Sequence, residues 1–127
     1  MTTSHLAGPI AGLVLLWSAG CGELTGAGFE SDVSTVQVVS ANVGGKNVYL
    51  PSTIVIVGGR PHTLSLYNTT ETPHGFSIAG VGVEAVLPPG EETLVELPVL
   101  EGGAVHRIHC QLHEAHRTAT LVVLPGG

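Results

Sequence analysis

The residues best suited to chemistry are concentrated in one short segment near the end of the chain. Residues 109–116 read HCQLHEAH and contain one cysteine, three histidines and one glutamate. Thiolate and imidazole are the ligands that copper and zinc prefer. Cys110, His113 and His116 follow one another with two residues between each, so a tight loop can turn all three toward one ion. The spacing predicts a metal-binding loop, and a solvent-exposed polar loop is the alternative.

A second segment, TPHGFSI at 72–78, supplies His74. It follows an alternating segment at 62–68 that is typical of a strand, and it is far in sequence from the cysteine loop. A fourth ligand from this position would complete a metal site and connect two distant parts of the fold. We therefore expect His74, Cys110, His113 and His116 to be the metal ligands.

The remaining polar residues near these ligands are expected to have ordinary roles. His109 should point to the opposite face of its strand from Cys110, because side chains alternate along a strand. His62 and His106 are separated from the ligands by extended chain and should be partly exposed. Three carboxylates lie close to the ligands in sequence and should be solvated: Glu71, Glu84 and Glu114. Of these, Glu84 is the first choice to support a ligand through a hydrogen bond.

The N-terminus reads as processing sequence. Residues 6–17 form an apolar run that is short for a membrane span, and small residues follow it. The motif SAGC, ending at Cys21, resembles the lipobox of bacterial lipoproteins, in which the cysteine is lipidated. We expect a signal peptide at 1–20, a tether at 21–32 and one folded domain at 33–127. The protein should be extracytoplasmic, in the periplasm or at the cell surface, anchored to the membrane through Cys21 or simply secreted.

Composition narrows the classes of partner and the role of the cysteine. The net charge is −6 with four basic residues, which argues against nucleic acid as a partner. Without its leader the folded domain keeps a single thiol, Cys110. A lone thiol in an oxidising compartment calls for either burial or a bound metal.

The segments between the motifs favour an all-β fold. No segment shows sustained helical periodicity, and short β-branched or alternating runs recur about every eight to twelve residues. The pattern predicts an antiparallel β-sandwich. The expected strands lie at 33–41, 47–50, 52–59, 62–68, 75–86 with interruptions at Gly80 and Gly82, 93–99, 103–110 and 118–124.

With these motifs, residues 33–124 resemble a cupredoxin, the copper-binding Greek-key β-sandwich. In that family an upstream His and then a Cys, a His and usually a Met from the last loop bind one copper ion. The resemblance maps these ligands to His74, Cys110 and His113, with His116 in the position of the Met. The spacing of Cys110, His113 and His116 is similar to that of the short ligand loop of amicyanin. The segments GFSI (75–78) and CQLH (110–113) instead resemble nitrosocyanin, which has a Glu in place of His74 and a longer loop to the last His.

The resemblance implies one copper ion per chain. The site should be neither a standard blue copper site nor a copy of the red copper site of nitrosocyanin. An exposed His116 would be the first ligand released by acid. The leading functional hypothesis is one-electron transfer to a redox partner that the sequence does not identify. Alternatives are binding or redox catalysis of a small molecule such as nitric oxide, copper carriage, and a structural zinc site. Enzymatic activity is left open, with electron transfer favoured.

Overall fold

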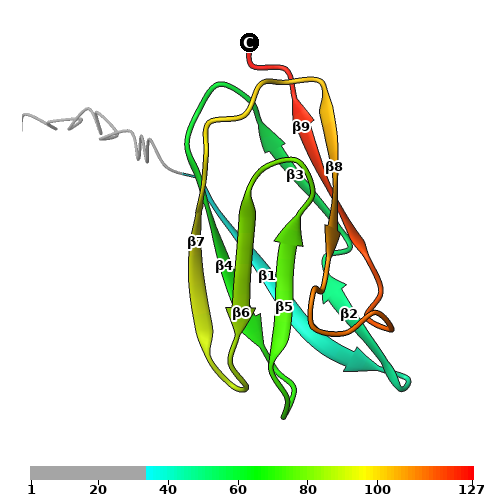
Figure 1. Cartoon of the computed structure of the whole chain (residues 1–127). Helices are drawn as coiled ribbons and strands as arrows, with labels where there is room; N and C mark the ends of the chain where they lie inside the picture. Colours follow the sequence, from blue (N-terminus) through cyan, green and yellow to red (C-terminus); the bar gives the residue numbers. More distant parts are fainter. Residues whose placement is uncertain (1–33) are drawn as a thin grey trace, which may run out of the picture.

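A computed structural model describes residues 34–127 as nine β-strands in two facing sheets (Figure 1). The predicted signal peptide, the tether and Cys21 lie outside the described residues. Residues 34–127 contain no helix long and apolar enough to cross a membrane. The strands are β1 (Ser34–Val43), β2 (Lys46–Leu50), β3 (Thr53–Val57), β4 (His62–Asn68), β5 (His74–Ile78), β6 (Val83–Leu87), β7 (Glu92–Leu97), β8 (Ala104–His109) and β9 (Ala119–Leu124).

The sheets are mixed, which differs from the expected antiparallel arrangement. One sheet has the order β2-β1-β4-β7 and the other β3-β9-β8-β5-β6. Most neighbours are antiparallel, but β1 pairs with β4 and β3 pairs with β9 in parallel. The chain changes sheets between β2 and β3 and again before β4. Parallel neighbours need such a crossover rather than a tight hairpin, and this connection provides one.

The core lies between the sheets and follows from strand alternation. On β3, for example, Ile54 and Ile56 are buried while Thr53 and Val55 are exposed. Strand β5 departs from this alternation because all five of its residues are buried. It lies between β6 and β8, and Gln111 from the last loop covers its outer side at Gly75. The first residues of β5 are therefore enclosed by protein on both faces.

The topology brings the two predicted ligand segments to one end of the sandwich. Strands β5 and β8 are antiparallel, with Ser77 opposite His109. The start of β5, at His74, therefore lies beside the end of β8, where the loop 110–118 begins. This loop crosses the end of the molecule to reach β9 (Figure 1).

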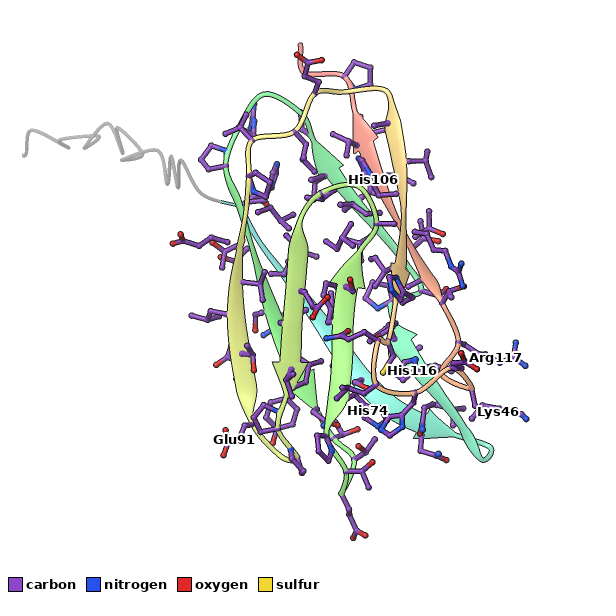
Figure 2. All side chains as sticks on the ribbon, in the orientation of Figure 1. Lys46, His74, Glu91, His106, His116 and Arg117 are labelled. Atoms are coloured by element: carbon purple, nitrogen blue, oxygen red, sulfur yellow. The ribbon has the colours of Figure 1, made fainter. Side chains whose placement is uncertain are left out.

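The two histidines expected to be partly exposed differ from each other. His106 is half-buried and lies at the opposite end of the sandwich from His74 and His116 (Figure 2), as expected. His62 is instead buried, with 5% of its surface exposed. The prediction for His62 was wrong because β4 is an interior strand of its sheet. Its Nε2–H donates to the Val57 carbonyl at 2.7 Å.

Candidate metal centre

His74 and His116 lie close together at the end of the sandwich where the two motifs converge (Figure 2), and the ring of His113 also lies beside that of His74. The His74 ring centroid lies 5.2 Å from that of His113 and 5.0 Å from that of His116. Two imidazoles that share one metal at about 2.0–2.1 Å have centroids roughly 5 Å apart when the ligands are arranged tetrahedrally. The spacing of the His74 ring from each of the other two rings is therefore compatible with a shared metal ion.

His74 is the most unusual side chain of this cluster. It is fully buried, with 0% exposure, and neither ring nitrogen has a hydrogen-bond partner. A buried polar group left unpaired costs about 1–3 kcal/mol, so such groups are rare in native proteins and call for an explanation. Burial lowers the pKa of His74, and repulsion from His116 and His113 lowers it further. A neutral imidazole with two free nitrogens fits a metal ligand.

Cys110 lies next to His74 and is held by the backbone of β5. Its side chain is 6% exposed, and its sulfur accepts a hydrogen bond from the Gly75 N–H at 3.1 Å. A Cβ on Gly75 would collide with Gln111, so glycine lets the loop approach β5 this closely. The hydrogen bond from the Gly75 N–H therefore fixes the position of the Cys110 sulfur beside the start of β5.

His113 is exposed and has one nitrogen free. Its Nε2 lies 3.0 Å from the Pro73 carbonyl oxygen. Because a carbonyl only accepts, Nε2 carries the proton and the neutral ring keeps the lone pair on Nδ1. Metal-binding histidines typically donate their other N–H to a carbonyl or carboxylate, which fixes the ring and its tautomer. The Pro73 carbonyl therefore prepares His113 for a ligand role.

His116 is buried, with 4% exposure, and both of its nitrogens are occupied. Its Nδ1–H donates to the Arg117 carbonyl at 2.9 Å, so Nε2 holds the lone pair and accepts from the Ser40 hydroxyl at 3.3 Å. Burial lowers the pKa of His116, although the bond to Arg117 opposes this shift. Binding a metal would require His116 to give up one of these bonds, so its role as fourth ligand stays a prediction.

The side chains of the proposed ligands lie near one another, but their donor atoms do not point to one common position. Among residues 34–127, no group of three or more His, Cys, Asp or Glu side chains is arranged to hold a metal ion. The hydrogen bonds of His113 and His116 explain this, because they turn ring nitrogens toward carbonyl oxygens and a hydroxyl. His74 is the proposed ligand whose ring nitrogens have no hydrogen-bond partner to give up.

The carboxylates near the ligands are exposed, as expected: Glu71, Glu84 and Glu114. Glu84, on β6, was the first choice to support a ligand, and that role stays a prediction. The side chain that connects the loop to β6 is Gln111, whose Nε2–H donates to the Ala85 carbonyl at 2.9 Å. His109 is half-buried and borders a small hollow beside Cys110.

Tyr49 was not expected from the sequence to support this site. It belongs to β2, in the opposite sheet, and is 1% exposed. Its hydroxyl donates to the Gly75 carbonyl, and its ring lies 4.1 Å from that of His116 at an interplanar angle of 31°. Burial raises the pKa of Tyr49, and nearby Cys110 raises it further, so the hydroxyl keeps its proton. The only local signal was an aromatic residue in a short strand.

Comparison with known proteins shows the family. A family model described as the cupredoxin-like domain matches residues 9–123. The chain belongs to the cupredoxin-like family. A search of the curated proteins finds no match. The all-β cupredoxin-like fold predicted from the sequence is thereby confirmed, whereas the finer similarity to nitrosocyanin stays a prediction.

Solved structures share the fold of this cupredoxin at low sequence identity. A purple cupredoxin from Nitrosopumilus maritimus has 23% identity and a TM-score of 0.53, covering 69% of this chain and 98% of its own. The metal-binding domain of a Cu(I)-exporting P-type ATPase from Streptococcus pneumoniae, solved with Cu(I), has 15% identity and a TM-score of 0.62, covering 75% and 89%. A multicopper oxidase from Aquifex aeolicus has 11% identity and a TM-score of 0.63 over 72% of this chain, which spans 29% of that protein.

The buried histidines predict how the stability of the metal-free cupredoxin depends on pH. The folded-state pKa values of His74 and His116 lie below the 6.5 of a free imidazole. Between those values and about pH 6.5, the unfolded chain binds protons that the folded chain does not. Each histidine should therefore remove up to about 1.4 kcal/mol of stability per pH unit as the pH falls through this range.

Urea unfolding of the metal-free protein between about pH 8 and pH 5 would measure this effect. We expect a plateau above about pH 6.5 and a falling midpoint below it. The variant His106→Gln, which alters a histidine far from the cluster, should show the same profile. A midpoint that stays constant through the acidic range would contradict the lowered pKa values.

Proposed function

We propose that this protein binds one copper ion through His74, Cys110, His113 and His116 and transfers single electrons outside the cytoplasm. Membership of the cupredoxin-like family indicates copper binding or electron transfer as the class of function. The observation that carries the finer proposal is His74, buried with both nitrogens unpaired beside the buried thiol of Cys110. Copper, when bound, supplies a one-electron couple.

The protein's part in this function is to hold the ligands in place. His74 is the first residue of β5, Cys110 directly follows β8, and the Gly75 N–H donates to the Cys110 sulfur. A ligand set held this firmly suits copper because little has to move between its oxidation states. His113 is the exposed member of the set and faces solvent, so it provides an edge through which an electron can enter or leave.

Copper reconstitution followed by redox titration tests this proposal. We expect metal analysis to give about one equivalent of copper per chain and the titration to show a reversible one-electron couple. A copper-loaded protein without a reversible couple would favour copper carriage. A protein that retains zinc and rejects copper would favour a structural zinc module.

One observation favours a second candidate, the binding of a small molecule at the metal. A hollow of about 260 Å³ is bordered by three of the proposed ligands, Cys110, His113 and His116. Arg107, His109, Glu114 and Thr118 complete its lining, which therefore carries groups of both charges, so a small polar molecule fits its chemistry. Azide added to the copper form would change the EPR spectrum if a coordination position is open, and would leave it unchanged if protein ligands fill the site.

The proposed location outside the cytoplasm predicts the behaviour of the N-terminal cysteine. If Cys21 is lipidated, the protein should partition with membranes, and Cys21→Ala should release or mislocalise it. Fractionation and mass analysis of the mature N-terminus would measure both effects. A soluble wild-type protein with an unmodified N-terminus would remove the anchor and leave simple secretion.

A further inference from the structure

A groove on the β2 side of the candidate centre is not used by the proposed copper site. This β2 groove is a hollow of about 740 Å³. Its lining includes apolar Val43, Val48 and Leu50, the cations Lys46 and Arg117, and Tyr49. Val43 and Leu50 are 55% and 46% exposed. The lining of the groove therefore combines apolar side chains with two positive charges.

The groove is formed by two segments that the backbone holds together. The β1–β2 hairpin supplies Lys46, and the residue that follows His116 in the last loop is Arg117. The Arg117 N–H donates to the Asn47 carbonyl at 2.9 Å, which ties the loop to β2. Figure 2 shows the side chains of Lys46 and Arg117 extending outward on the same side of the molecule, near His116.

Charge is unevenly distributed over the molecule. The whole chain has a net charge of −6, yet no Asp or Glu lines the β2 groove. In the sheet β2-β1-β4-β7 the groove lies at the β2 edge, whereas Glu92 and Glu96 belong to β7 at the opposite edge. Glu91, just before β7, lies across the molecule from Lys46 and Arg117 (Figure 2). The groove is thus a local positive region on an acidic protein.

The groove is also close to the candidate centre. Tyr49 lines it, and the same ring lies 4.1 Å from the His116 ring. The Tyr49 hydroxyl donates to the carbonyl of Gly75, whose N–H binds the Cys110 sulfur. A molecule seated in the groove would be separated from the proposed ligands by this one side chain.

We propose that the β2 groove is the docking site for an acidic redox partner protein. Carboxylates of the partner pair with Lys46 and Arg117, and its apolar side chains cover Val43 and Leu50. Charges in an interface steer encounter and set orientation, while apolar contact excludes water. The half-exposed apolar residues along the hairpin suit the surface of a partner protein better than an enclosed small molecule.

This inference deepens the proposed function by naming its partner class. Copper held by the proposed ligands would supply the one-electron couple, so that one electron lost by the partner would be gained at the copper site, or the reverse, with no bond or proton exchanged. Docking itself depends on the protein surface and does not require bound copper. It can therefore be tested separately from copper binding.

The test uses the metal-free protein, labelled with ¹⁵N, and cytochrome b5 as a small acidic probe. At an ionic strength of about 0.01 M, where the screening length is about 30 Å, we expect amide shifts confined to 43–50 and 117–118. Arg117→Glu should weaken this binding about tenfold, because it reverses a charge in the groove. The matched control is Arg60→Glu, which makes the same charge change in the β3–β4 connection at the other end of the sandwich, and it should weaken binding less than twofold.

Three results would overturn the proposal. Equal losses of binding for Arg60→Glu and Arg117→Glu would show that net charge alone governs binding and would overturn the assignment of the docking site to the β2 groove. Shifts over the β7 edge, or shifts caused by self-association of the protein without the probe, would do the same. Arg117→Gln, with the charge removed but not reversed, should give an intermediate loss, and thermal unfolding of each variant shows that the fold is kept.

Discussion

The Cys110→Ser variant, after copper reconstitution, should lose the visible thiolate-to-copper absorption completely. The absorption requires a sulfur donor, and a serine hydroxyl is a harder and far more weakly ionised ligand than a thiolate. The buried position of Cys110 between the β5 backbone and the last loop makes it the central donor of the proposed centre. The absorption spectrum of the copper-loaded variant is the measurement.

The same substitution should remove most of the stabilisation that copper gives the fold. A ligand present at about a thousand times its Kd stabilises the folded state by roughly 4 kcal/mol. For a domain of this size that raises Tm by more than about 10 °C. We expect wild-type protein to show such a rise on adding copper and Cys110→Ser to show little, with the metal-free variants compared first to account for packing.

The matched control for this experiment is a substitution of His109, the residue that precedes Cys110. His109→Gln changes a half-buried side chain that is not among the proposed ligands and should keep both the absorption and the rise in Tm. If the serine variant retained the visible spectrum, Cys110 would not be a ligand and the proposed centre would be wrong.

The His116→Met variant should shift the copper spectra toward the blue pattern and raise the reduction potential. A thioether is a weak, long axial ligand, whereas imidazole is a stronger donor that favours Cu(II) and lengthens the copper–thiolate bond. With His116 bound, charge-transfer intensity should lie at shorter wavelength and the EPR copper hyperfine splitting should be wide. Each tenfold loss in preference for Cu(II) corresponds to about 59 mV in potential.

The hydrogen bonds of His116 make this prediction a demanding one. To bind copper, the ring must release either the Ser40 hydroxyl or the Arg117 carbonyl. The control Ser40→Ala removes a competing partner and keeps the imidazole, so it should preserve the non-blue spectrum. A wild-type protein that is already blue, and unchanged by the Met substitution, would leave a three-ligand site with a hydrogen-bonded histidine beside it.

The expected effect of acid on the loop rested on an exposed His116. The structure buries His116 and exposes His113 instead, so that premise was wrong. The reason is the loop's attachment to β2: the Asn47 carbonyl binds the Arg117 N–H and draws the end of the loop inward. Proximity in the sequence does not show which of two neighbouring loop residues turns toward the core.

The sequence by itself determined the strands and the place where chemistry is concentrated. Alternation and β-branched runs depend on local backbone preferences, so the expected segments coincide closely with the observed strands. The segment 75–86 divides into β5 and β6 around Gly80 and Gly82, both with φ of +76° as their turn requires. Cys110 and His113 could be selected as ligand candidates because their types and spacing are local.

Only the tertiary structure decided what surrounds those residues. The parallel pairing of β1 with β4, the burial of His62, the support from Tyr49 and the β2 groove all depend on contacts between segments distant in the chain. Ser40 and His116 are 76 residues apart, yet their hydrogen bond decides which lone pairs the site has free. A local pattern shows which face of a strand is apolar, whereas the partner of each polar atom is set by the packing of the two sheets.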